Sequence, residues 1–143
     1  MQSCFLACLL LNVAACVSIP KTTDQLVAST ETVERYCYDE PVQVVETRVE
    51  ALLSKCYHPV ASVMPIGNAY VPMTMDWSVI KEDIADNKTR YSVGNKLGYG
   101  FSAEMESNAD DCQTKMTLYG VTEFWKRFFA KVDSAAQGGQ PGC

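Results

Sequence analysis

The chain has only one histidine, His58, among its 143 residues. The five cysteines from Cys16 onward are also never separated by the roughly two to four residues that zinc ligands usually keep between them. No residue pattern near His58 supplies the nucleophile or carboxylate that a catalytic histidine needs, so a histidine at a helix end is the better explanation. We therefore expect no metal site, no cofactor and no catalytic residue.

Glycine-rich phosphate loops and an excess of positive charge are absent as well. Gly94, Gly98 and Gly100 follow a predicted strand without opening a helix, and they match neither a dinucleotide-binding fingerprint nor a P-loop. Asp110 and Asp111 lack the D-x-D-x-D-G series of a calcium loop. The net charge is −5 at pH 7. An acidic domain repels phosphate backbones, so nucleic acid is not an expected partner.

The beginning of the chain carries no acidic or basic side chain over residues 1–16. The mostly apolar segment 4–17 has about 14 residues, fewer than the roughly 20 of a membrane-spanning helix but typical of the apolar part of an export signal. Residues 1–3 contain no Lys or Arg, although the start of a signal peptide is usually basic. Either the free amino terminus supplies the positive charge, or the true start lies upstream.

Residues 13–16, Val-Ala-Ala-Cys, resemble the lipobox of bacterial lipoproteins, in which an aliphatic residue and two small residues precede the lipidated cysteine. The resemblance implies a signal peptide over residues 1–15 and a lipid on Cys16. Because Val17 and Ser18 follow, and not Asp, it also implies transfer to the outer membrane of a Gram-negative bacterium. A plainly secreted protein is the alternative, since ordinary export signals also end in small residues.

Four cysteines remain if Cys16 carries lipid, and this even number predicts two disulfides in an oxidising compartment. A Cys37–Cys56 bond is disfavoured, because a continuous helix over residues 41–56 would hold its ends about 22 Å apart, farther than the linking chain and a disulfide can bridge. Two pairings stay open. We prefer Cys56–Cys112 with Cys37–Cys143 over Cys37–Cys112 with Cys56–Cys143.

Two amphipathic helices are predicted. Asp39-Glu40-Pro41 provides start signals for the first, which ends before Pro59. Its apolar stripe at helical period consists of Val42, Val45, Val49, Leu52, Leu53 and Cys56. The second helix begins at Thr122, whose side chain we expect to cap it. Its bulky residues are Phe124, Trp125, Phe128, Phe129 and Val132.

Alternating apolar and polar residues between these helices predict strands joined by short turns, which favours an antiparallel meander. The strands cover residues 73–79, 89–93, 99–105 and 114–119, and the turns cover residues 86–88, 94–98 and 107–111. Residues 59–72 contain three prolines and predict a connection, with a short edge strand over 62–64.

The predicted fold class is α+β. A meander of about four strands, with a possible fifth strand from residues 32–38, packs in two layers against the N-terminal and C-terminal helices. Residues 32–137 make up this single domain. Residues 16–31 are rich in Ser and Thr and lack periodicity, which predicts a flexible tether. Residues 138–143 form a tail that acts as a leash for Cys143.

This arrangement resembles a group of small α+β lipoproteins of Gram-negative bacteria. The resemblance rests on residues 45–56, on residues 112–119 and on Phe124-Trp125, and it implies no catalytic residue. We therefore expect a non-enzymatic envelope lipoprotein that is anchored in the membrane by lipid at Cys16 and binds another envelope component, such as a protein.

A binding protein for a small apolar or peptide ligand, held between sheet and helices, is the alternative function. Aromatic residues would line such a cleft, and five are placed to do so. They are Trp77, Tyr91, Tyr99, Trp125 and Phe129. Because each fits the buried face of a predicted element, we expect them to pack in the core instead.

Overall fold

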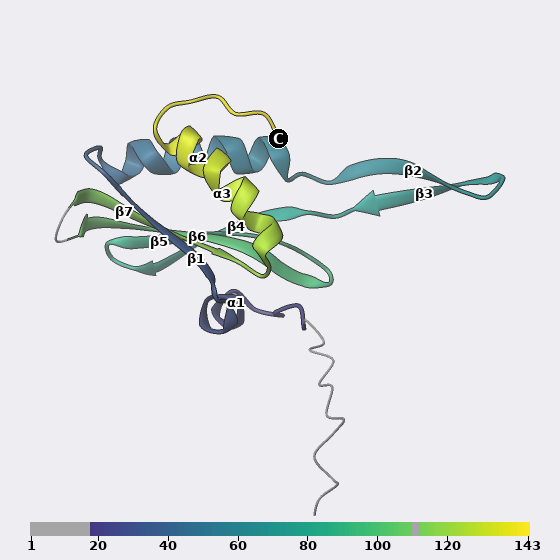
Figure 1. Ribbon diagram of the computed structural model, residues 1–143, viewed down its shortest axis with the longest axis horizontal. Coiled ribbons are helices and arrows are strands. Elements are labelled where there is room, and N and C mark those ends of the chain that lie inside the picture. The colour runs from purple at the N-terminus through teal and green to yellow at the C-terminus, as the bar shows by residue number, and fades with distance from the viewer. Residues whose placement is uncertain (1–17, 110–111) are drawn as a thin grey trace, which may run out of the picture.

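The computed structural model describes residues 18–109 and 112–143. Figure 1 shows a five-stranded antiparallel sheet with two helices above it, and a separate two-stranded hairpin that projects to one side. The elements are α1 (Thr23–Ser29), β1 (Thr32–Tyr38), α2 (Val42–Cys56), β2 (Val60–Ile66), β3 (Ala69–Met75), β4 (Ser78–Ala85), β5 (Lys88–Asn95), β6 (Gly98–Ala109), β7 (Cys112–Gly120), the 3₁₀ turn η1 (Glu123–Trp125) and α3 (Lys126–Ala136). The α+β prediction is confirmed.

The main sheet has the strand order β1-β7-β6-β5-β4. Strands β4 to β7 form the expected meander, because each pairs with its neighbour in the sequence. The segment 32–38 is indeed a strand, and β1 pairs antiparallel with β7 from Thr32 opposite Gly120 to Tyr38 opposite Thr114. Within the described residues, no helix is both long enough and apolar enough to cross a bilayer.

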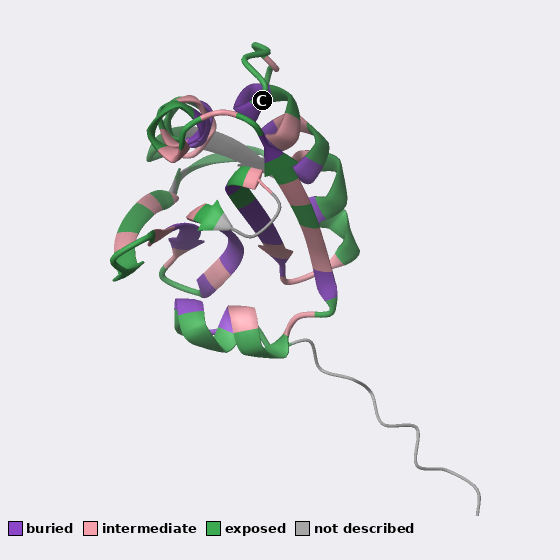
Figure 2. Ribbon diagram, turned by 90° about the vertical axis from the view of Figure 1, so that its left-hand side faces the viewer, coloured by how far each residue is buried: buried purple, intermediate pink, exposed green. Residues whose placement is uncertain are grey.

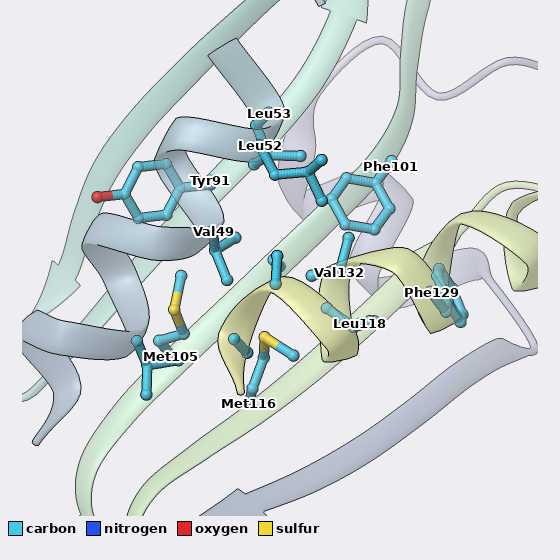
Figure 3. Close-up of a cluster of buried hydrophobic side chains, with 14 of the residues drawn as sticks. Val49, Leu52, Leu53, Tyr91, Phe101, Met105, Met116, Leu118, Phe129 and Val132 are labelled. Atoms are coloured by element: carbon cyan, nitrogen blue, oxygen red, sulfur yellow. The ribbon is translucent and has the colours of Figure 1, made fainter. Parts of the chain in front are cut away.

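The core lies between one face of this sheet and the helices α2 and α3 (Figure 3). The predicted stripe of α2 is confirmed at Val45, Val49, Leu52 and Leu53, all of which are buried. α3 adds Phe129 and Val132. The sheet supplies the opposing side chains Tyr91, Val93, Phe101, Ala103, Met105, Met116 and Leu118. Alternation along the strands and helical period along α2 thus converge on a single apolar layer.

The start of the last helix differs from the prediction. Thr122 precedes η1, but its side chain makes no capping hydrogen bond. η1 has the tighter 3₁₀ winding, which changes the direction of its side chains relative to α3. As a result, Phe124 is 77% exposed, whereas Trp125 is buried against the backbone at Gly100 and Gly120.

The tether predicted for residues 16–31 is wrong where the structure describes that segment. Residues 23–29 form α1, whose N-cap Thr22 accepts a hydrogen bond from the Gln25 backbone N–H at 3.1 Å. Leu26 is fully buried. Figures 1 and 2 place α1 on the face of the sheet opposite α2 and α3, so it covers part of the second face. One buried leucine in a seven-residue helix is too short a pattern to predict from sequence.

The structure contains two disulfides, as predicted, but their pairing is the alternative one and the preferred pairing is wrong. Cys37 bonds Cys112 with 5.6 Å between Cα atoms, and Cys56 bonds Cys143 with 5.3 Å. The antiparallel pairing of β1 with β7 brings the end of β1 to the start of β7, which joins Cys37 to Cys112. The tail after α3 runs back to the end of α2 (Figure 1), where Cys143 bonds Cys56. Sequence reasoning lacked the position of β1 in the sheet.

Candidate interaction surface

Residues 59–72 were predicted as a connection with a short edge strand over 62–64. That strand lies within β2, but the segment as a whole forms most of an antiparallel hairpin of β2 and β3. The pairing runs from Val60 opposite Met75 to Ile66 opposite Ala69. Gly67 begins the two-residue turn at a φ of 62°, a conformation that glycine adopts without a steric penalty. At about 3.3 Å per residue, each seven-residue strand is about 23 Å long. The hairpin projects beyond the end of α2 and away from the main sheet (Figure 1).

The hairpin is apolar although it projects into solvent. Residues 59–75 contain no Asp, Glu, Lys or Arg, in a chain of which 20% is charged. Tyr70 is 78% exposed, Val60 is 44% exposed and Val71 is 38% exposed. The register places Val60 and Val71 on one face of the ribbon and Tyr70 on the other, so both faces expose apolar side chains. A projecting apolar surface of this kind is a candidate interaction site.

Two prolines modify the outer edges of the hairpin. Pro65 pairs with Tyr70, and Pro72 pairs with Val63. Hydrogen-bonded and non-hydrogen-bonded pairs alternate along an antiparallel ladder. Counted from the turn, these are the second and fourth pairs, so both belong to the same class. A proline has no N–H for the ladder and fits only the class whose backbone groups point outward. Each outer edge therefore lacks one donor that an added strand would need.

Aromatic side chains hold the base of the hairpin. Tyr57 precedes β2 and Trp77 follows β3, and their ring centroids lie 5.9 Å apart. Tyr57 also packs edge-on against Phe128 of α3, with 5.2 Å between centroids. Burial raises the pKa of Tyr57 to about 12. The Cys56–Cys143 disulfide lies directly before this cluster. Both strands of the hairpin therefore extend from a base that is packed and cross-linked.

Of the five aromatic residues expected in the core, Tyr91, Trp125 and Phe129 are buried. Trp77 and Tyr99 are half-buried. The core side chains fill the interface between the sheet and helices α2 and α3, where the alternative function requires a ligand (Figure 3). A hollow of about 580 Å³ lies elsewhere, between the start of α2 and the β4–β5 turn, and polar residues dominate its lining.

A buried polar cluster lies on the second face of the sheet, beneath α1. Arg90 of β5 contacts Glu104 of β6 at 2.8 Å and Asp24 of α1 at 2.6 Å. Lys88 contacts Glu104 at 2.7 Å, and the Tyr119 hydroxyl donates to Glu104 at 3.2 Å. Burial alone would raise the pKa of Glu104, but hydrogen bonds from Lys88 and Arg90 outweigh it and hold that pKa below its usual value. These charged side chains pair with one another, and the Arg90–Asp24 contact binds α1 to the sheet.

The remaining sequence predictions concern metal and catalysis. His58 is exposed in the link between α2 and β2. Over residues 18–109 and 112–143, no three His, Cys, Asp or Glu side chains gather closely enough to hold a metal ion. Cys16, the proposed lipid site, lies outside the described residues, as do Asp110 and Asp111.

Sequence reasoning missed the hairpin, although signals for it were present. Gly67-Asn68 is a turn sequence, and β-favouring residues without charge flank it on both sides. The prolines obscured it, because proline is normally counted against a strand.

Comparison with protein-family models, curated protein sequences and solved structures finds no match for this chain.

Proposed function

We propose that the protein is a lipid-anchored binding protein of the bacterial envelope, and that the β2–β3 hairpin is its binding element. The observation that carries this proposal is the uncharged hairpin, which projects from a rigid base and exposes Tyr70, Val60 and Val71. Solvent would favour charged side chains on such a ribbon. Their absence over residues 59–75 is explained if a partner covers the hairpin.

The partner is a protein rather than the interior of a bilayer. A two-stranded ribbon has two edges with unpaired backbone groups, and these groups find no hydrogen-bond partner in hydrocarbon. Pro65 and Pro72 also make strand addition along the edges unfavourable. The hairpin therefore binds through its side chains, with its faces against apolar surface of the partner and its edges open to water.

The disulfides support the envelope location in this proposal. Two disulfides, Cys37–Cys112 and Cys56–Cys143, are typical of an oxidising compartment such as the periplasm. Cys16, the proposed lipidation site at the end of the lipobox-like residues 13–16, lies only a few residues before the folded domain. Intact-mass measurement of protein extracted from membranes tests the anchor. We expect the mass of a chain that begins at a lipidated Cys16, and we expect Cys16→Ser to remove the lipid.

The hairpin is tested by co-isolation from solubilised envelopes after expression in a Gram-negative host. Tyr70→Glu places a charge on the hairpin, and Phe124→Glu is the matched control because Phe124 is 77% exposed and lies on the body. We expect a discrete envelope protein to accompany the wild type and Phe124→Glu, and to be lost with Tyr70→Glu. Equal recovery with both variants would show that the hairpin is not the binding element.

A further inference from the structure

The segment that precedes α1 is fixed to the turn between β5 and β6. The Tyr99 backbone N–H donates to the Pro20 carbonyl at 2.9 Å. The Lys21 ammonium donates to the Leu97 carbonyl at 2.6 Å. Gly98 permits this contact, since a Cβ at that position would lie 2.3 Å from the Pro20 carbonyl oxygen. The chain therefore joins the folded body before α1 begins.

The same contact gathers exposed apolar and basic side chains, which we call the Ile19–Leu97 corner. It consists of Ile19, Lys21, Lys96 and Leu97. Leu97 is 63% exposed and Ile19 is 43% exposed. A Cβ on Gly98 would lie only 2.7 Å from Cγ2 of Ile19, so Ile19 lies beside the turn that carries Leu97. Lys96 is 87% exposed and lies 3.3 Å from Asp76.

Only a short stretch of chain separates this corner from the proposed anchor at Cys16. Cys16 precedes Ile19 by three residues, and three extended residues span at most about 11 Å between Cα atoms. A lipid on Cys16 must enter the bilayer at its surface. If Cys16 is lipidated, Ile19 is therefore held within about 11 Å of the residue at the membrane surface.

We propose that the Ile19–Leu97 corner lies on the lipid bilayer and sets the orientation of the domain on the membrane. This inference rests on the proposed lipidation of Cys16. The exposed aliphatic side chains of Ile19 and Leu97 enter the headgroup boundary. The Lys21 and Lys96 ammonium groups exchange their contacts with the Leu97 carbonyl and Asp76 for contacts with lipid phosphates. Two lysines beside two exposed aliphatic residues suit an anionic surface even though the whole chain carries a net charge of −5.

Tryptophan fluorescence tests the proposal in the full mature chain, anchored through Cys16 in vesicles of phosphatidylethanolamine and phosphatidylglycerol with brominated acyl chains. Leu97→Trp reports on the corner, and Tyr70→Trp is the matched control because Tyr70 is also highly exposed. The wild type, with Trp77 and Trp125, supplies the background. We expect the added Trp at position 97 to be quenched about twofold or more, as for an indole at the acyl boundary, and the one at position 70 to be little affected.

Reversing the charges gives a second readout. Lys21→Glu with Lys96→Glu should weaken quenching of the Trp at position 97, whereas Lys55→Glu with Lys131→Glu, on α2 and α3, should not. Equal quenching at positions 97 and 70, or quenching at position 70 alone, would overturn the proposal. Quenching of the Trp at position 70 alone would mean that the hairpin contacts the bilayer.

The anchor itself is checked separately by the intact mass. If cells do not lipidate Cys16, the proposed anchoring fails on that measurement alone. Coupling Cys16 of the same chain to a maleimide phospholipid then supplies the anchor, because the other mature cysteines are held in disulfides. In this form too, the proposal requires stronger quenching of the Trp at position 97 than of the Trp at position 70. Unquenched Trp at position 97 in this anchored form contradicts the orientation directly.

Discussion

At the scale of single residues, Glu104 links the meander to α1. Its carboxylate is 3% exposed and receives contacts from Lys88, Arg90 and Tyr119. Arg90 continues the connection to Thr23 and Asp24 of α1. The alternation along β5 and β6 puts Arg90 and Glu104 on the opposite face from the apolar residues of these strands. It gave no reason to expect burial, because the helix that covers them was predicted as a tether.

Glu104→Gln should cost about 3–5 kcal/mol of stability near neutral pH, because it removes the buried anion that Lys88 and Arg90 share and leaves Arg90 only Asp24 and Glu82 as ion-pair partners. It should also change the pH dependence. The folded-state pKa of Glu104 is lowered, so its contribution is complete above the unfolded value of about 4.5 and is lost as the pH falls through the folded value. Denaturant titrations from pH 7 to pH 3 measure both effects. An unchanged acid limb in Glu104→Gln would contradict this role.

At the scale of elements, predictability follows the length of the repeating pattern. α2 was predictable, since its apolar stripe recurs over four turns and is bounded by Pro41 and Pro59. α1 was not, because Leu26 is its one fully buried apolar side chain. The hairpin was hidden by its prolines. The strand predicted over residues 73–79 divides at Asp76-Trp77, where the chain leaves the hairpin and enters the main sheet.

The stripe of α2 is tested by paired truncations on one helix. Leu52 is 5% exposed and faces the sheet, whereas Val44 is 38% exposed. Leu52→Ala should cost about 2–5 kcal/mol in denaturant titration, the usual range for a buried leucine. Val44→Ala should cost less than about 0.5 kcal/mol, as surface substitutions usually do. Similar losses in both variants would mean that the helix is packed differently.

The hairpin should be dispensable for stability. Residues 62–73 are replaced by Gly-Asn, which keeps the pair Ala61–Thr74 at the base. Because the hairpin lies outside the main core, we expect the free energy of unfolding to change by less than about 0.5 kcal/mol. A loss of several kcal/mol would show that the hairpin supports the fold, and its apolar composition would then need no partner.

At the scale of the whole molecule, the two disulfides close long loops around the core. Cys37–Cys112 spans 75 residues and Cys56–Cys143 spans 87. In the chain-entropy description, closing loops of this length stabilises the fold by about 4 kcal/mol each. Helix geometry correctly disfavoured Cys37–Cys56. The choice between the other pairings required the place of β1 beside β7, a long-range contact that no local pattern encodes.

Non-reducing peptide mapping should recover Cys37 linked to Cys112 and Cys56 linked to Cys143. Reduction should lower the free energy of unfolding by several kcal/mol, as in other small exported domains, where the usual loss is about 2–5 kcal/mol per bond. A peptide linking Cys56 to Cys112 would place the tail elsewhere and would contradict the base described for the hairpin.

The proposed role of the projecting hairpin is to bind a protein partner in the envelope. The most direct measurement is photo-crosslinking in living cells, with a photoreactive amino acid placed at Tyr70 and, as the matched control, at Phe124. These positions are 78% and 77% exposed, so they offer the probe equal access to solvent. We predict one discrete protein adduct from position 70, abolished by Val71→Glu, and none from position 124. No adduct from position 70, or the same adducts from both positions, would contradict the claim.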